Sequence, residues 1–327
     1  MTRKTVLICS ILLLNIVTYG QLPKITFTPH WLPQAQFAGY YVAQQKGFYV
    51  EEGIEVDIVH PSASVMANDR LITEESDVIS LFLITALNQK HKGLDLVNIA
   101  QLSQNSALIM VAKKDKNINY IKDFNGKRIG IWETGFDEVP KTLIRTNNCE
   151  VTWVPILSSI NMFMIGGVDA MTVMWYNEYD QIINSGINPD ELSTFFFSDY
   201  GYNIPEDGIY CLNKTLLQRK TDLQKFVVGT LRGWEYAKSH KEETLEIVLE
   251  VMKKGHIPTN LAHQSWMLDC VLELIEPGDK NINKGELLES DYQKIQDILL
   301  EGKYVDEEIP FHHFYKPVLE DKNNKQK

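Results

Sequence analysis

The chain alternates short β-branched runs with helical segments, and this alternation limits the folds open to it more than any other feature. Lys24–Thr28 (KITFT) predicts a strand, and residues 39–51 predict a helix that ends near Gly47 or Gly53. Ile54–Val59 (IEVDIV) predicts the next strand. The pattern continues with a helix over 64–72, a strand at Asp77–Leu83, a helix at Ile84–Gly93 and the strands LVNIAQL and ALIMVAK. Such units joined by short links favour an α/β fold with an open, largely parallel sheet.

A second unit of the same kind starts near Lys114. GKRIGIW predicts a buried strand and is followed by a helix over 137–146. Further predicted elements are the strands EVTWVPI and VDAMTVMW, the helix SSINMFMIGG and a helix over 179–184. Gly208–Asn213 (GIYCLN) predicts a strand that returns to the first unit. The chain is thus expected to cross between two lobes near Lys113 and Glu206, which places a cleft between them.

The N-terminal segment predicts export. Arg3 and Lys4 precede the apolar run Val6–Val17, and residues 1–20 end in Thr-Tyr-Gly, as in a secretory signal peptide cleaved between Gly20 and Gln21. The run is short for a membrane span. We therefore expect an exported, soluble periplasmic protein. Its mature part of about 300 residues exceeds what one hydrophobic core usually serves.

These boundaries give an expected domain organisation. Residues 1–20 form the signal peptide, and residues 21–113 plus 207–320 form a discontinuous first lobe. Residues 114–206 form the second lobe, and residues 321–327 form a flexible tail.

Charge and cysteine content exclude several classes of function. The net charge is -11, and loss of the leader removes two basic residues and no acidic ones. Such a chain, without a dense basic tract, is not expected to bind nucleic acid. Cys149, Cys211 and Cys270 remain after cleavage and are far apart, so one disulfide and one free thiol are possible. No CxxC or Cys/His spacing predicts a metal site.

Common catalytic motifs are missing from the sequence. It contains no GxSxG, no HExxH, no P-loop and no GxGxxG behind a strand. The adjacent His312 and His313 are expected to be a surface pair. We therefore predict no catalytic residue, no cofactor and no metal.

Aromatic and polar side chains follow several predicted strands. In open α/β sheets, ligands bind at the carboxyl ends of the strands. The candidates of this kind are Trp31, Tyr40, Phe82, Trp132, Trp175, Tyr176, Asn177 and Glu178. Flat aromatic faces beside carboxylate and amide groups suit a planar, nitrogen-containing ring. Glu178 is expected to accept a hydrogen bond from a ring or amino N–H, and Gly39 is expected to let its helix start close to Trp31.

An anionic ligand would need different residues. Ser62 and Ser64 precede a predicted helix and could offer such a site at its start, although ordinary N-capping explains them better. No Arg lies beside the aromatic positions, which disfavours a doubly charged ligand.

The stretch WLPQAQFAGYYVAQQKGFYVEEGIEVDI resembles the opening of ABC-transporter substrate-binding proteins of the nitrate/sulfonate/thiamine-pyrimidine type. DFNGKRIGIW and GGVDAMTV extend the resemblance, which covers Lys24 to Tyr315 and is strongest to the branch with the thiamine pyrimidine synthases. It implies a type II periplasmic-binding-protein fold, with two Rossmann-like lobes that close on a hinge around a small molecule.

The resemblance also implies a ligand and a site. The ligand would be a thiamine-precursor pyrimidine, stacked on aromatic side chains and held by a carboxylate. The corresponding positions are Trp31, Gln34, Trp132, Trp175, Tyr176 and Glu178, with Gln34 where related proteins often have Asn. Phe136 completes the candidate site. A monomer that delivers its ligand to an inner-membrane ABC permease is expected, and a sulfonate or other small organic anion is the alternative ligand.

The same branch contains enzymes, and the sequence departs from them. The Lys and His that the yeast-type synthases use would fall on Leu81 and Thr85, and neither side chain can form a Schiff base or act as an imidazole. Lys90 and His91 lie one to two helical turns away. The Cys-rich cluster ahead of the return strand is also missing, since PEDGIYCLN holds only Cys211. A binding protein is therefore predicted in preference to a synthase.

Overall fold

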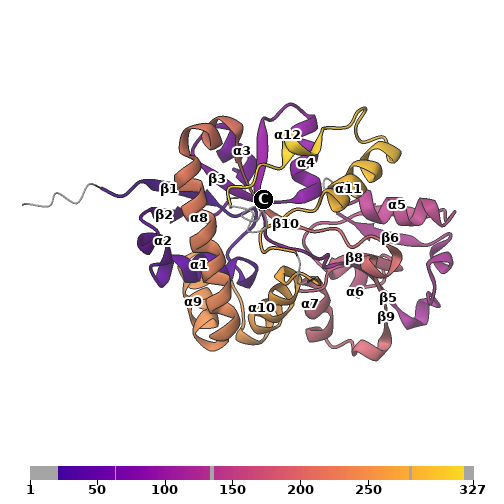
Figure 1. Ribbon diagram of the computed structural model, residues 1–327. Coiled ribbons are helices and arrows are strands. Elements are labelled where there is room, and N and C mark those ends of the chain that lie inside the picture. Colours follow the sequence, from indigo (N-terminus) through magenta and orange to yellow (C-terminus); the bar gives the residue numbers. More distant parts are fainter. Residues whose placement is uncertain (1–20, 63, 133–135, 280–281, 320–327) are drawn as a thin grey trace, which may run out of the picture.

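The computed structural model describes residues 21–62, 64–132, 136–279 and 282–319 and contains two five-stranded sheets. The first sheet has the spatial order β2 (Glu55–Ile58), β1 (Lys24–Thr28), β3 (Val78–Phe82), β10 (Asp207–Leu212) and β4 (Leu96–Gln101). The second has the order β7 (Thr152–Pro155), β6 (Arg128–Ile131), β8 (Ala170–Met174), β5 (Leu108–Lys113) and β9 (Leu192–Phe196). Each sheet is the centre of one lobe (Figure 1).

Each sheet is parallel except for one strand. In the first sheet β1 runs parallel to β2 and β3, whereas β10 is antiparallel to both of its neighbours. In the second sheet β6 runs parallel to β7 and β8, whereas β5 is antiparallel to β8 and β9. The exceptions, β5 and β10, are the first strands after the two crossings between lobes. The predicted largely parallel α/β architecture and the return strand at β10 are confirmed.

The first crossing lies earlier than predicted. Because β5 pairs with β8 and β9, the chain changes sheets between Gln101 and Leu108, and the expected crossing near Lys113 is wrong. β5 is buried nearly throughout, so its uniformly apolar sequence does not reveal which sheet it joins. The second crossing ends at Asp207, where β10 begins, next to the predicted Glu206.

Helices cover the sheets in two groups. The first lobe contains α1 (Ala38–Gln45), α2 (Phe48–Glu51), α3 (Ala67–Ile72), α4 (Leu83–His91), α8 (Asn213–Ser239), α9 (Lys241–Lys254), α10 (Leu261–Ile275) and α12 (Phe311–Phe314). The second contains α5 (Glu138–Thr146), α6 (Asn161–Met164) and α7 (Glu178–Asn184). The late helix α11 (Glu289–Glu301) lies against α5, so the C-terminal part of the chain contacts both lobes (Figure 1).

One helix end is confirmed and one helix start needs correction. The helix expected to end near Gly47 or Gly53 ends at the first of these, because Gly47 has a left-handed φ of 76° that separates α1 from α2. The helix expected over 64–72 begins only at Ala67, where the carboxylate of Asp69 accepts the backbone N–H of Met66. Ser64 therefore precedes the helix and does not cap it.

Helices α1 and α8 cross with their backbones in contact. A Cβ on Gly39 would lie 2.4 Å from ring carbons of Trp234, and one on Gly233 would lie 2.0 Å from the carbonyl oxygen of Gly39. Glycine at position 39 is thus required by α8, and the expectation that it serves Trp31 is wrong. The contact holds Trp234 in one position above α1.

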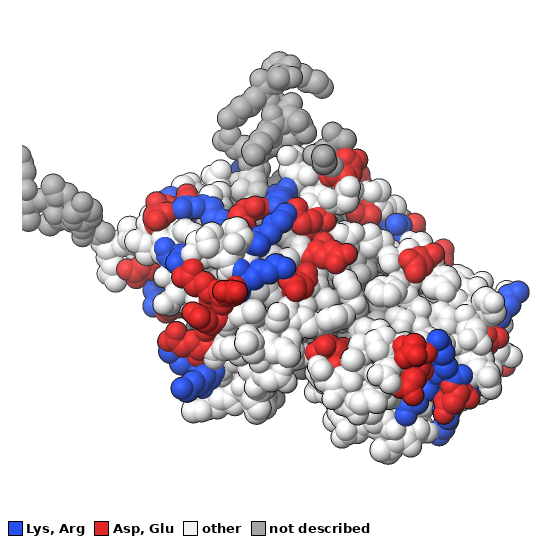
Figure 2. Space-filling view, turned by 90° about the horizontal axis from the view of Figure 1, so that it is seen from below, with Lys and Arg blue, Asp and Glu red and all other residues white. Residues whose placement is uncertain are grey.

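Cys149, Cys211 and Cys270 are free thiols. No helix in the described ranges is long and apolar enough to cross a membrane. On the face seen in Figure 2, the larger and smaller bodies meet at a waist, and acidic and basic side chains are intermixed on both.

Replacement of Gly39 with alanine tests the helix crossing. The added methyl group would overlap Trp234, so Gly39→Ala is expected to lower the free energy of unfolding by about 2 kcal/mol. Gly278→Ala is the control, because no atom lies within 4 Å of the place that its methyl group would take and the site is exposed. Urea unfolding of both variants provides the comparison. Equal stability of the two would contradict the close crossing.

Candidate functional site

A cavity lies between the two lobes. Its space, part of which is open to solvent, amounts to about 370 Å³. The lining residues are Phe82, Leu83, Ile84, Ser106, Leu108, Phe136, Glu138, Val139, Met174, Ile204, Pro205 and Glu206. They come from the end of β3, the starts of α4 and α5, the end of β8 and both crossings. We call this space the first cavity.

A second cavity adjoins the first at Glu206, which lines both. Its space is about 270 Å³, again partly open. The lining residues are Gln36, Leu102, Ser103, Tyr176, Glu206, Asp207, Trp234, Val271, Leu274 and Ile275. Tyr176 follows β8 of the second lobe, whereas the first lobe or the crossings supply the others. Both cavities thus depend on the relative position of the lobes.

Aromatic rings form one wall of the first cavity. The rings of Phe82 and Phe136 meet edge to face at a centroid distance of 4.7 Å. The ring centroid of His30 lies 4.5 Å from that of Phe82, and the ring centroid of Trp132 lies 5.5 Å from that of Phe136. The structure therefore brings the predicted Phe82 and Phe136 into the cavity, with Trp132 supporting Phe136.

Four carboxyl groups are buried around the cavities. Burial raises the pKa of Glu138 to about 7, of Glu178 to about 7, of Glu206 to about 8 and of Asp207 to about 7. Of these four residues, only Glu178 was among the site residues predicted from the sequence. The others belong to the acidic pairs Asp137-Glu138 and Glu206-Asp207, and such pairs usually mark solvated turns. Their position at a helix start and at a crossing was the only available signal.

Glu206 joins the two crossings. Its Oε1 accepts hydrogen bonds from Ser106 Oγ at 2.9 Å and from the backbone N–H groups of Ala107 at 2.8 Å and Leu108 at 3.1 Å. A carboxylate that receives three donors compensates part of its desolvation. This arrangement fixes the second crossing to the first at the base of the cleft.

Glu138 and Asp207 each keep one oxygen without a partner in the described chain. Asn88 of α4 donates to Glu138 Oε1 at 2.7 Å, whereas Glu138 Oε2 is buried and has no hydrogen bond. Gln36 donates to Asp207 Oδ2 at 2.9 Å. Asp207 Oδ1 lies 3.8 Å from His30 Nε2, beyond hydrogen-bond range, and is likewise unpartnered. Each oxygen belongs to a residue that lines a cavity.

Glu178 serves the protein itself. Its two oxygens accept hydrogen bonds from the backbone N–H of Met174 at 3.0 Å and from Asn177 Nδ2 at 2.7 Å. The side chain is buried at the start of α7 and lines neither cavity. Both oxygens are used in shaping the loop after β8, which disfavours the predicted ligand contact.

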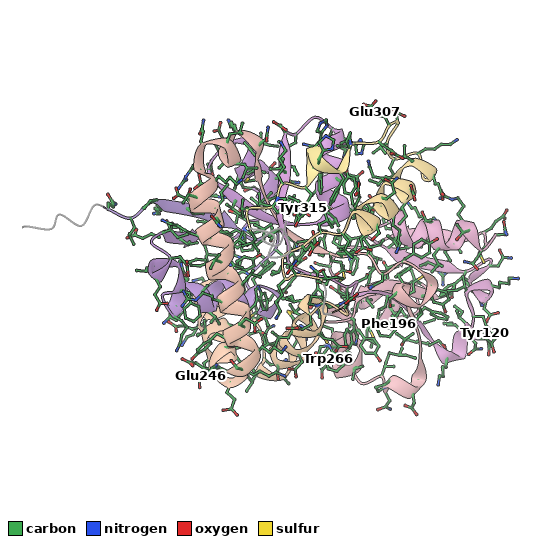
Figure 3. The ribbon with its side chains drawn as sticks, viewed as in Figure 1. Tyr120, Phe196, Glu246, Trp266, Glu307 and Tyr315 are labelled. Carbon is green, nitrogen blue, oxygen red and sulfur yellow. The ribbon has the colours of Figure 1, made fainter. Side chains whose placement is uncertain are left out.

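Helix α10 closes one rim of the cleft. Trp266 Nε1 donates to the carbonyl of Trp175 at 3.0 Å, and the Trp175 ring contacts both Trp266 and Phe196, which Figure 3 labels. His263 places Nδ1 2.6 Å from Asp180 Oδ2 and Nε2 3.1 Å from Asn177 Oδ1. The predicted Trp175 and Asn177 thus form contacts between lobes.

The remaining predicted residues line neither cavity. Trp31 is 38% exposed, and its carbonyl contacts His60. Tyr40 belongs to the core, stacked on Phe27 at 4.3 Å. Gln34 donates to Gln36 Oε1 at 2.6 Å, and Gln36 in turn donates to Asp207, so Gln34 contacts Asp207 only through Gln36. Ser62 and Ser64 are exposed at the surface.

The residues at or near the positions that the synthases use lie in β3 and α4. Leu81 is buried in β3, and Lys90 donates to the carbonyl of Leu96. His91 contacts Gln296. Within the part of the chain that the structure describes, no group of three or more His, Cys, Asp and Glu residues could hold a metal ion.

Glu178→Gln tests the cost of burying this carboxyl group. In the unfolded chain the Glu178 carboxyl group loses its proton near its ordinary pKa of 4.5. In the folded protein it keeps the proton up to its raised pKa of about 7. The folded state therefore loses stability through this group as pH rises between these values. The free energy of unfolding of the variant, relative to that of the unsubstituted protein, should therefore increase on the order of 2–3 kcal/mol from pH 5 to pH 8.

Urea unfolding of both proteins at the two pH values measures this difference. Burial lowers the pKa of His30 to about 3 and that of His60 to about 4, so these two side chains make the folded state more stable as pH rises toward 6.5. Both proteins contain them, so their effect cancels in the difference between the two. The variant also loses an acceptor, a cost that does not depend on pH. A stability difference that is the same at both pH values would contradict the raised pKa of the buried Glu178 carboxyl group.

Comparison with solved structures identifies the fold. The periplasmic aliphatic sulphonate binding protein SsuA from Escherichia coli superposes with a TM-score of 0.69 at 14% identity, over 91% of this chain and 94% of that one. The predicted two-lobed periplasmic-binding-protein fold is confirmed.

Sequence relatives include binding proteins and enzymes. A putative thiamine biosynthesis protein of Haemophilus influenzae is 25% identical over 78% of this chain and 81% of its own length. The formylaminopyrimidine-binding protein of Halalkalibacterium halodurans is 22% identical over 75% and 76%. A 4-amino-5-hydroxymethyl-2-methylpyrimidine phosphate synthase of Schizosaccharomyces pombe is 30% identical, but over only 33% of this chain and 31% of its own. The profile of the NMT1/THI5 like family matches residues 34–244, and the chain belongs to this family.

Proposed function

We propose that this protein is the extracytoplasmic solute-binding component of an ABC importer and that it captures a small heteroaromatic solute, a thiamine-precursor pyrimidine. The observation that carries the proposal is the first cavity, whose walls come from both lobes and combine aromatic rings with buried carboxyl groups. A solute held there contacts both lobes at once. The relative named as a formylaminopyrimidine-binding protein supports the same ligand class.

Ligand capture follows from a shift between open and closed lobes. In the described structure Asn88 of the first lobe donates to Glu138 of the second, and Trp266 donates to the carbonyl of Trp175, so these bonds hold the lobes together. A solute that contacts both walls binds the closed form more tightly and raises its population. The crossings, held together by Glu206, remain in place and act as the hinge.

The chemistry of the walls favours a ring with N–H donors. Phe82 and Phe136 offer apolar surface for a flat ring. Glu138 Oε2, buried and unpartnered in the described structure, is the oxygen that accepts an amino N–H, a role that the sequence analysis gave to Glu178. Among the described residues that line the two cavities there is no Lys or Arg, so a sulfonate would meet carboxyl groups without a counter-charge.

A binding role without catalysis accords with the positions that the synthases use. Leu81 is buried in β3, and Thr85 provides only a hydroxyl group. Delivery to an inner-membrane permease, a monomeric state and a periplasmic location belong to the same proposal. So does the signal peptide at residues 1–20, which lies outside the described residues.

Titration with 4-amino-5-hydroxymethyl-2-methylpyrimidine tests the proposal. Trp132 and Trp175 lie near the cavity and between the lobes, so binding should change the intrinsic fluorescence. Phe82→Ala should weaken binding about tenfold or more, because one aromatic wall is lost. Tyr120→Ala, at the exposed far end of the second lobe (Figure 3), should leave affinity unchanged. A response to taurine without any response to pyrimidines would refute the ligand and retain the class of protein.

A further inference from the structure

The second cavity contains a hydrogen-bond donor and an acceptor that the protein leaves unused. Trp234 is 3% exposed, and its indole N–H has no partner in the described chain. Asp207 also lines this cavity, and its Oδ1 is buried and has no hydrogen-bond partner in the described chain. Buried polar groups are nearly always paired, so a donor and an acceptor left over beside one cavity indicate that something else pairs with them.

The donor is held rigidly by the fold. Gly39 and Gly233 let α1 and α8 approach so closely that the Trp234 ring lies directly against the α1 backbone. The ring of Tyr40 meets it edge to face at 6.5 Å. Because its indole is packed on these sides, the N–H group keeps its position without a hydrogen bond of its own.

The acceptor is held by a relay of two amides. Gln34 Nε2 donates to Gln36 Oε1 at 2.6 Å, which orients the Gln36 amide so that its Nε2 donates to Asp207 Oδ2 at 2.9 Å. The other carboxyl oxygen, Oδ1, is left for a different donor. This relay gives Gln34, a predicted site residue, an indirect role in positioning.

The surroundings of the pair are suited to a small polar group. Val271, Leu274 and Ile275 of α10 give an apolar wall, and Ser103 lies on the lining as well. Tyr176 covers the cavity from the second lobe, so separation of the lobes uncovers it. The shared residue Glu206 places it next to the aromatic first cavity.

We propose that the second cavity is a specificity subsite that receives a hydroxyl-bearing substituent of the bound solute, which accepts from Trp234 Nε1 and donates to Asp207 Oδ1. This inference rests on the proposed function, because the ring of the same solute occupies the first cavity. A hydroxyl group provides one donor and one acceptor on a single atom and matches the unused pair. A methyl group in the same place leaves both protein groups unpaired, which costs affinity.

The test compares two solutes that differ by one oxygen atom. These are 4-amino-5-hydroxymethyl-2-methylpyrimidine and 4-amino-2,5-dimethylpyrimidine, titrated calorimetrically at pH 8, above the pKa of about 7 that burial gives Asp207. The unsubstituted protein should prefer the hydroxymethyl compound about tenfold or more. Trp234→Phe should reduce that preference to about twofold or less.

Asp207→Asn is the second variant and keeps the size of the side chain. Since Gln36 Nε2 requires an oxygen opposite it, the new amide nitrogen takes the place of Oδ1 and turns an acceptor into a donor. The preference for the hydroxymethyl compound should again fall. Trp266→Phe is the matched control, because its indole pairs with Trp175 and lines neither cavity. Trp266→Phe should lower the affinity for both compounds by the same factor.

Nuclear magnetic resonance provides a readout that does not depend on affinity. The indole ¹⁵N–¹H signal missing from Trp234→Phe identifies Trp234, and the hydroxymethyl compound should move that signal much further than the dimethyl compound does. Equal affinity losses for both compounds in Trp234→Phe, with equal movements of the indole signal, would overturn the subsite and leave the proposed function intact. Failure of both pyrimidines to bind the unsubstituted protein would overturn both.

Discussion

Burial of carboxyl groups between the lobes is the constraint on which the rest of the structure depends. Glu138, Glu178, Glu206 and Asp207 are withdrawn from water, and their raised pKa values report what this costs. Glu178 and Glu206 recover part of the cost through backbone N–H donors. Glu138 and Asp207 recover less, because one oxygen of each has no partner in the described structure. A solute with matching donors stabilises the arrangement that the protein alone leaves incomplete.

The fold positions these groups through its two crossings. β5 and β10 enter their sheets antiparallel to their neighbours, directly after the chain passes from one lobe to the other. Glu206, at the end of the second crossing, bonds Ser106, Ala107 and Leu108 of the first. The hinge and the floor of the site are therefore the same residues, and a change in lobe angle alters both cavities. Helix α10 adds contacts at the rim, where the two lobes meet.

The sequence predicted the architecture well because strands and helices follow from local patterns. The crossing near Lys113 was misplaced because β5 is apolar on both faces, and sheet membership depends on partners distant in sequence. Phe82, at the end of β3, lines the first cavity, but a strand end does not fix where a side chain points. Trp31 is accordingly on the surface, and Tyr40 is in the core. In the sequence Glu206 and Asp207 resemble solvated acidic residues, because their burial follows from the position of β10 between β3 and β4.

A crystal structure of the protein with 4-amino-5-hydroxymethyl-2-methylpyrimidine tests the central claim most directly. The ring is expected in the first cavity against Phe82 and Phe136, with its amino nitrogen within about 3.2 Å of Glu138 Oε2. A ring bound outside the space between the lobes, or an amino group that faces no carboxyl oxygen, would contradict it.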